Sequence, residues 1–248
     1  MSRGGGAPIV EDGAPEGPDR STGARDLQGR RHTSSLAPTH DAPMYLQPLD
    51  LRFDRIRAGL DPASLNADGR PFDARPGREA AVAIVLRPAA EDLEFLLVKR
   101  AESPRDPWSG HMALPGGRRD PGDPNLVATA IRETAEETRV LLDSSWTLGR
   151  LDSISPQSRR LPTLDVHPFV FAAPSRTEAF PEAGEIASVH WVPLAHLLDP
   201  SRQRTVDIPL IGTIREFPAY ELDGRIVWGL TYRILKTFIE SWRTPRSA

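Results

Sequence analysis

Short apolar runs separated by polar turns fill the middle of the chain. Residues 80–86 are continuously apolar and lie between charged residues and proline, a pattern typical of a buried strand. Residues 94–98 form a second apolar run after a polar turn at 89–92, which predicts an antiparallel hairpin. The same patterns predict strands at 148–152, 166–172 and 188–192 and a short helix at 193–198.

The last part of the chain predicts one more hairpin and one more helix. Asp223-Gly224 separates residues 216–220 from 225–228, and this dipeptide favours a two-residue hairpin turn. A helix is expected from about Trp228 to Trp242. Strands and helices in this mixed order predict an α/β fold in which helices cover a mixed sheet.

The beginning of the chain has a different character. Residues 1–43 are rich in glycine, proline and charge and contain few large apolar side chains, so we expect a disordered tail. Residues 44–60 contain enough apolar positions for a short helix that packs on a hydrophobic core, and a proline-rich segment follows. We therefore expect a tail at 1–43, a lead-in at 44–77 and a folded domain at 78–243.

Composition excludes several classes of function. The 248 residues carry a net charge of −3, which gives no electrostatic reason to expect nucleic acid or an anionic membrane as a partner. There is no cysteine, which excludes thiolate nucleophiles, zinc–thiolate sites and disulfides. No apolar run approaches ~20 residues, and the first residues lack the apolar segment of a signal peptide. A cytoplasmic location is the expectation.

A glycine-rich loop leads into a helix that carries three carboxylates. Asp123 is expected to cap this helix and Pro124 to occupy its first position. Apolar positions at helical spacing supply one face of the helix. The three carboxylates, which fall within an arc of roughly 100° beside that face, are Glu133, Glu136 and Glu137.

These carboxylates repel one another, and a hard divalent cation such as Mg²⁺ or Mn²⁺ removes the repulsion through oxygen ligands. Arg132 lies four residues before Glu136, where it can pair with that carboxylate. Gly116 and Gly117 let the backbone approach a metal or phosphate closely. A solvated acidic face is the competing interpretation. The glycine loop and the arginine together favour a metal site.

The stretch resembles the Nudix box, whose pattern is G-x5-E-x7-R-E-U-x-E-E-x-G-U with U apolar. The direct matches are Gly117, Arg132, Glu133, Glu136 and Glu137. Asp123 stands where the early acid belongs, although eight residues rather than seven separate it from Arg132. Thr134 replaces an apolar residue, and Arg139 replaces the late glycine. A non-glycine residue costs roughly 1 kcal/mol in a left-handed turn, so we expect the helix to continue for another turn.

The resemblance implies an α/β/α sandwich and the hydrolysis of a nucleoside diphosphate linked to another group. It implies that Glu133 and Glu137 hold Mg²⁺ or Mn²⁺ with help from Glu136, and that the backbone at Gly116–Gly117 adds a contact. The general base is either a glutamate of the box or Glu185, which precedes a predicted strand. An exposed charge without a catalytic role is the competing interpretation of Glu185. The predicted catalytic set is Arg132, Glu136, Glu137 and Glu185.

The segment before the box resembles that of coenzyme A pyrophosphatases, L-L-T-x-R-(S/A)-x3-R-x3-G-x3-(F/L)-P-G-G. Val98 replaces the threonine, and four residues rather than three separate Arg105 from Gly110. The resemblance implies cleavage of coenzyme A or acyl-coenzyme A, with Arg100 and Arg105 as candidates to bind its 3′-phosphate. One alternative is a Nudix hydrolase for ADP-ribose or another nucleotide derivative. Another is a non-catalytic nucleotide-binding protein with a degenerate box. Homodimers recur in the family, so a second copy of this chain is a further candidate partner.

Overall fold

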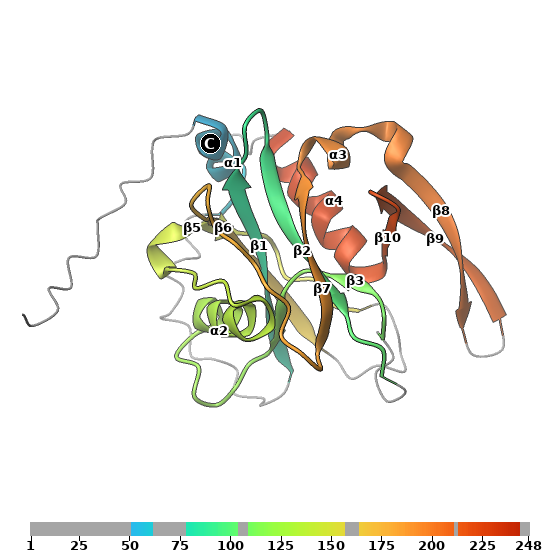
Figure 1. Cartoon of the computed structure of the whole chain (residues 1–248), viewed down its shortest axis with the longest axis horizontal. Coiled ribbons are helices and arrows are strands. Elements are labelled where there is room, and N and C mark those ends of the chain that lie inside the picture. The colour runs from blue at the N-terminus through green and yellow to red at the C-terminus, as the bar shows by residue number, and fades with distance from the viewer. Residues whose placement is uncertain (1–50, 62–77, 104–108, 157–163, 211–212, 244–248) are drawn as a thin grey trace, which may run out of the picture. The chain divides into compact units, whose positions relative to one another are not determined.

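The computed structural model describes residues 51–61, 78–103, 109–156, 164–210 and 213–243 (Figure 1). The predicted tail and much of the predicted lead-in lie outside this part, so their boundaries stay predictions. The helices are α1 (Leu51–Ala58), α2 (Leu126–Thr138), α3 (Ala195–Leu198) and α4 (Gly229–Arg243), with 3-10 turns η2 (Ser144–Trp146) and η3 (Pro200–Arg202). The strands are β1 (Glu79–Pro88), β2 (Leu93–Arg100), β3 (Met112–Ala113), β4 (Gly116–Arg118), β5 (Thr147–Arg150), β6 (Asp165–Ala172), β7 (Ile186–Pro193), β8 (Gln203–Leu210), β9 (Thr213–Leu222) and β10 (Arg225–Trp228).

The main sheet is mixed, as the sequence predicted. Its strands follow the order β3-β2-β1-β6-β5, with β4 also paired to β1 and β7 to β2. β1 runs parallel to β6 and antiparallel to β2, so the predicted hairpin of the first two strands is present. A second sheet in the described region has the order β10-β9-β8.

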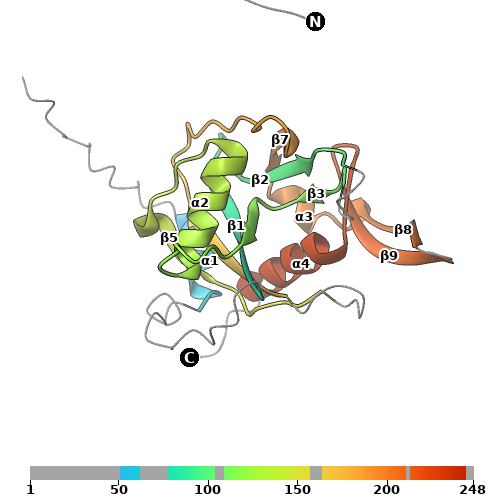
Figure 2. The same cartoon turned by 90° about the horizontal axis from the view of Figure 1, so that it is seen from below.

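Side chains alternate along each strand, so each face of the main sheet presents its own apolar side chains. Helices cover both of these faces. On one face, Ala81 and Val85 of β1 belong to a core that includes Ala130 of α2. On the other face, Ile84 of β1 belongs to a core that includes Phe238 of α4. Figure 2 shows α2 and α4 on either side of the strands. The α/β class is therefore confirmed, with helix, sheet and helix as its three layers.

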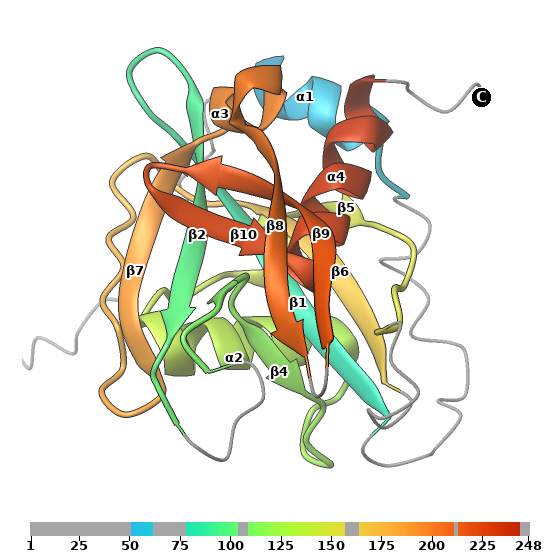
Figure 3. The ribbon, with the colours of Figure 1, turned by 90° about the vertical axis from the view of Figure 1, so that its right-hand side faces the viewer.

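The first two strands diverge at one end, and this divergence positions the glycine loop. β1 pairs with β2 over Leu86–Pro88 but with β4 over Ala80–Val82. The other end of β2 pairs with β3. The segment from β3 to β4 therefore fills the space between the diverging strands (Figure 3). This arrangement brings the backbone of Gly116 to α2, where its N–H donates to Glu137 Oε2 at 3.0 Å.

The later elements agree with the expectations except for one strand. The predicted hairpin turn is present, with Asp223 at φ 52° and Gly224 at φ 76°, as a turn of this type requires. The sequence reading missed β8, which pairs with β9 along its whole length. Val206, Ile208 and Leu210 alternate with Asp207 and Pro209, but a proline within a run argues against a strand in a sheet, so the segment was not predicted as one. No helix in the described ranges is long and apolar enough to cross a membrane.

Candidate active site

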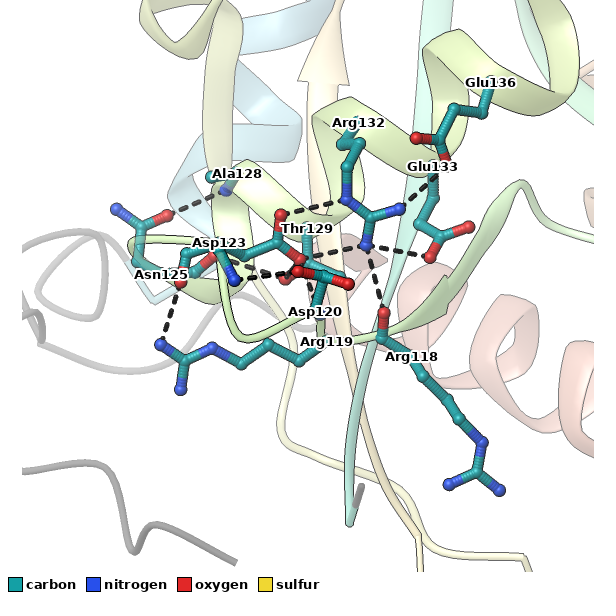
Figure 4. A network of polar contacts seen from close by, with 11 residues as sticks. Arg118, Arg119, Asp120, Asp123, Asn125, Ala128, Thr129, Arg132, Glu133 and Glu136 are labelled. Carbon is teal, nitrogen blue, oxygen red and sulfur yellow. Dashed lines mark hydrogen bonds and ion pairs between the residues drawn. The ribbon is translucent and has the colours of Figure 1, made fainter. Parts of the chain in front are cut away.

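Helix α2 begins one residue after an asparagine cap. The Asn125 side chain accepts a hydrogen bond from Ala128 N–H at 2.8 Å, and the helix starts at Leu126 (Figure 4). The expectation that Asp123 caps the helix and Pro124 starts it was wrong. Asp123 is unavailable because its carboxylate accepts from the Asp120 N–H at 2.9 Å, inside the loop before the helix.

Asp123 is buried and forms an ion pair with the partly exposed Arg132. Asp123 is 7% exposed, and its two carboxylate oxygens each accept one hydrogen bond from Arg132, both at 2.9 Å. The Thr129 hydroxyl donates a further bond to Asp123 at 2.9 Å. The hydrogen bonds from Arg132 are the main cause that lowers the pKa of Asp123 to about 2. The carboxylate is thus fixed in its ionised form, and it ties the loop to the helix.

Arg132 also contacts two of the three carboxylates of the box. Its guanidinium lies 2.9 Å from Glu133 Oε1 and 2.8 Å from Glu136 Oε2, and it donates to the Arg118 carbonyl at 3.1 Å. Figure 4 shows these groups converging on the one guanidinium. The predicted pairing of Arg132 with Glu136 is present. The Glu136 side chain is 56% exposed, which makes it the most solvated carboxylate of the three.

Glu137 is the buried carboxylate of the site. It is 5% exposed, accepts from Gly116 N–H and lies 3.9 Å from Arg100 Nη1. Burial raises its pKa to about 7, although the Gly116 hydrogen bond and Arg100 oppose this shift. Glu133 and Glu185 raise it further by repulsion, so both carboxylates lie within electrostatic reach of Glu137. Burial also raises the pKa of Glu133.

The two glycines leave room for these carboxylates. A Cβ atom at Gly117 would lie 2.5 Å from the Glu133 carboxylate. Gly116 has φ 151°, and a Cβ there would lie 2.3 Å from the Ala81 carbonyl oxygen of β1. Any side chain would therefore displace either Glu133 or the pairing of β4 with β1. The backbone approaches the carboxylates as closely as the sequence analysis expected.

The end of α2 corrects a second expectation. The helix does not continue past Thr138, because Arg139 adopts the left-handed conformation at φ 59° and its N–H donates to the Ala135 carbonyl. The segment at 180–182 takes up the last carbonyls of the helix: Phe180 N–H donates to Thr138 and Glu182 N–H to Glu137. The Arg139 side chain pairs with Glu182 at 3.1 Å. These contacts offset a backbone cost of roughly 1 kcal/mol.

The arrangement fits a hard divalent cation. Glu133 and Glu137 are one turn apart on the face of α2 that meets the glycine backbone, and carboxylate oxygens are the ligands that Mg²⁺ and Mn²⁺ prefer. As the side chains stand, no three His, Asp or Glu residues in the described part of the chain converge closely enough to hold a metal ion. Two carboxylates plus substrate oxygens suit Mg²⁺, which uses few protein ligands.

The structure thus groups most of the predicted residues. Arg100, Gly116, Gly117, Glu133 and Glu137 meet at one place, with Glu185 exposed in front of β7 and within electrostatic reach. Glu136 is directed to Arg132, and Arg105 lies outside the described residues. The roles of these residues stay predictions.

Sequence analysis missed several supporting groups. Asn125 was identifiable, because it directly precedes the first apolar residue of the helix. Nothing in the sequence indicated the Thr129 hydroxyl. Arg119 was missed too: its N–H donates to the Glu79 carbonyl at 3.0 Å, and its side chain donates to the Asp123 carbonyl at 3.0 Å. It joins the loop to the start of β1.

Metal affinity is expected to depend on pH through Glu137. A metal binds the ionised carboxylate, so below pH 7 a proton must leave and the apparent affinity falls about tenfold per pH unit. Calorimetric titration with Mn²⁺ should show about tenfold tighter binding at pH 6.5 than at 5.5, and little change from 7.5 to 8.5. The Glu137→Gln variant should lose most of this dependence. Equal affinity of the wild type at 5.5 and 7.5 would contradict the assignment.

Comparison with known proteins identifies the family. The NUDIX domain family matches residues 77–211. The uncharacterised Nudix hydrolase NudL of Yersinia pestis is 31% identical over 161 residues, which are 64% of this chain and 77% of NudL. An uncharacterised protein of Schizosaccharomyces pombe is 38% identical over 117 residues, which are 46% of this chain and 36% of that longer protein. The chain belongs to the Nudix family.

Among solved structures, the fold is similar to a NUDIX hydrolase from Alicyclobacillus acidocaldarius, with 25% identity and a TM-score of 0.42 over 50% of this chain and 83% of that one. Together with the family match, the Nudix hydrolase relatives define the class of activity. This protein is a Nudix pyrophosphohydrolase, which cleaves a nucleoside diphosphate linked to another group. Enzymes of this class need divalent cations. A non-catalytic role is not favoured.

Proposed function

We propose that the enzyme cleaves coenzyme A or acyl-coenzyme A into 3′,5′-ADP and (acyl-)4′-phosphopantetheine. The observation that carries this proposal is the position of Arg100. It belongs to the segment that resembles coenzyme A pyrophosphatases, and its guanidinium lies 3.9 Å from the Glu137 carboxylate. That segment and the Nudix box therefore contribute to one site. The alternative substrate, ADP-ribose, becomes an outcome of the test.

The site residues divide the work of phosphoryl transfer, in which catalysis is mainly positioning and charge stabilisation. Glu133 and Glu137 would hold Mg²⁺ or Mn²⁺. When bound, the cation neutralises the diphosphate and lowers the pKa of water. Arg132 orients Glu133 and Glu136 through its contacts at 2.9 and 2.8 Å. Arg100 would stabilise negative charge beside Glu137.

Glu185 remains the predicted general base, with a glutamate of the box as the alternative. Its exposed carboxylate precedes β7, and its own carbonyl accepts from Ala101 N–H at 2.8 Å, directly after Arg100. This backbone hydrogen bond keeps the backbone of Glu185 next to the segment that carries Arg100. An exposed acid at this point can take a proton from water and release it to solvent.

Substrate preference tests the proposal. A charge-assisted contact to the 3′-phosphate contributes roughly 1.5–3 kcal/mol, or about tenfold to a hundredfold in kcat/KM. Coenzyme A should therefore be cleaved at least about tenfold better than 3′-dephospho-coenzyme A, and better still than ADP-ribose. Phosphate-containing products would be measured for all three substrates at one fixed Mg²⁺ concentration. A preference for ADP-ribose would leave the Nudix activity intact and remove the coenzyme A assignment.

A further inference from the structure

Three polar side chains share the face of β2 and β7 that lies opposite α2. Lys99 pairs across the strands with Ser188, and Leu97 pairs with His190. Because directly opposed residues of an antiparallel pair point to the same side, Lys99, Ser188 and His190 lie on the face that also carries Leu97. The Ser188 hydroxyl is 2.8 Å from His190 Nε2. All three side chains are half-buried.

A second cation, Arg225 of the other sheet, lies within electrostatic reach of His190. Arg225 begins β10, which packs on the same side as α4 (Figure 3). Burial lowers the pKa of His190, and Arg225 and Lys99 lower it further by repulsion, whereas Asp223 opposes them. The Asp223 carboxylate is already paired with the Arg202 guanidinium at 3.4 Å. Positive charge therefore dominates around His190.

Neither cation has a carboxylate partner within the part of the chain that the structure describes. Arg225 donates to the Asp223 carbonyl at 3.1 Å, a neutral acceptor. The other lysine of the sequence behaves differently: Lys236 is 54% exposed and pairs with Glu240 at 3.9 Å. Removing a cation from water is unfavourable unless an opposite charge compensates. Two half-buried cations beside a hydroxyl and an imidazole thus form a surface that an anion would stabilise.

We propose that Lys99, Arg225, His190 and Ser188 form a binding subsite for a phosphate monoester. The lysine supplies a point charge and the arginine a planar pair of donors, both of which suit phosphate oxygens. The hydroxyl and a protonated imidazole supply two more donors. Such a subsite binds the free oxygens of a phosphate monoester through charge-assisted hydrogen bonds.

Strand β2 connects this subsite to the catalytic carboxylates. Lys99 and Arg100 are consecutive, and the register of β2 with β7 shifts between them, so the contacts of each side chain rather than ideal alternation show which face it occupies. Arg100 is directed to Glu137. The end of β2 therefore presents one cation to the metal carboxylates and the next cation to the subsite. We assign the 3′-phosphate of the adenosine ribose to this subsite in place of Arg100, which is directed to Glu137, and this assignment rests on the proposed function.

The lysine content allows a direct test of binding without catalysis. Because the chain contains only Lys99 and Lys236, lysine-selective isotope labelling gives two side-chain signals in an NMR spectrum. Inorganic phosphate and, separately, adenosine 3′,5′-diphosphate would be added at constant ionic strength in the presence of EDTA. The signal that the Lys99→Met variant lacks should shift and saturate. The signal that the matched Lys236→Met variant lacks should stay in place.

The imidazole provides a second readout. A bound anion favours the charged ring, so phosphate should raise the pKa of His190, measured from its ring signals between pH 5 and 8. The groups that face this ring are Ser188, Lys99, Arg225 and Asp223. Failure of both additions to move the Lys99 signal, or equal movement of both lysine signals, would overturn the subsite.

Kinetics then separate the subsite from the proposed function. Lys99→Met should reduce the preference for coenzyme A over dephospho-coenzyme A by at least about tenfold, while Lys236→Met keeps it. If the preference survives in Lys99→Met, the assignment to the 3′-phosphate is wrong. If phosphate binds at Lys99 but the wild type cleaves neither compound, the proposed function is wrong and the subsite stands. The wild-type spectra answer the binding question even if a variant fails to fold.

Discussion

Replacing Glu137 with glutamine is expected to lower kcat by at least about 100-fold, the scale of losing one electrostatic contributor to a transition state. Glutamine keeps the size of the side chain and an oxygen that can accept from Gly116 N–H. It removes the negative charge that a metal ion requires. Because the wild-type carboxyl is 5% exposed with a pKa of about 7, a neutral group is tolerated there in the folded state.

The fold of this variant should therefore survive, and thermal unfolding should begin no lower than in the wild type. A matched control is Glu182→Gln, which removes an exposed carboxylate that pairs with Arg139 at 3.1 Å. An exposed pair contributes about 0–1 kcal/mol, so this control should keep its activity and stability. Near-normal turnover of Glu137→Gln at saturating Mg²⁺ would refute the role of Glu137 as a metal ligand.

Elements defined by local pattern were predictable, and those defined by pairing were not. The apolar runs that form β1 and β2 could be recognised because strands buried on both faces have nearly continuous apolar sequences. The turn at Asp223-Gly224 was visible because few dipeptides adopt positive φ at both positions. β8 was missed because Pro209 interrupts its short alternation of Val206 and Ile208, and its pairing with β9 reveals it as a strand. The short strands β3 and β4 are likewise defined by their pairing with β2 and β1.

The site could be predicted as a set of residues but not as a geometry. Helical spacing placed Glu133, Glu136 and Glu137 on one arc. It could not show that Glu137 is buried against Gly116 while Glu136 is solvated, because that difference arises from how α2 packs on the sheet. The burial of Glu137, which sets its pKa, is a tertiary property.

The two errors at the ends of α2 have the same origin. Asp123 is a good capping residue in isolation, but Arg132, nine residues later, engages its carboxylate. Arg139 is a poor residue for a left-handed turn, but hydrogen bonds from residues 180 and 182 end the helix there. Both outcomes depend on contacts between segments that sequence periodicity does not describe.

Replacing Asp123 with asparagine is expected to lower the free energy of unfolding by about 3 kcal/mol at pH 7. Breaking a buried ion pair by neutralising one member costs roughly 3–5 kcal/mol, and the low end applies because the Arg132 side chain is 30% exposed. The asparagine NH₂ would also face donors, since Asp120 N–H, the Thr129 hydroxyl and Arg132 all donate to this position. Urea unfolding would measure the loss. The exposed pair of Asp54 with Arg57 provides a control, and Asp54→Asn should cost less than about 1 kcal/mol.

The pH dependence of the same variant identifies the cause of the loss. Native Asp123 has a pKa of about 2, below the ordinary value of 3.8, so its ionised form stabilises the fold fully above pH 3.8. That stabilisation is lost as the pH falls from 3.8 through 2. The difference in unfolding free energy between wild type and Asp123→Asn should therefore be constant from pH 7 to 5 and shrink as the pH approaches 3. A difference that stays constant down to pH 3 would show that lost shape, rather than lost charge, destabilises the variant, and would contradict the ion-pair account of Asp123.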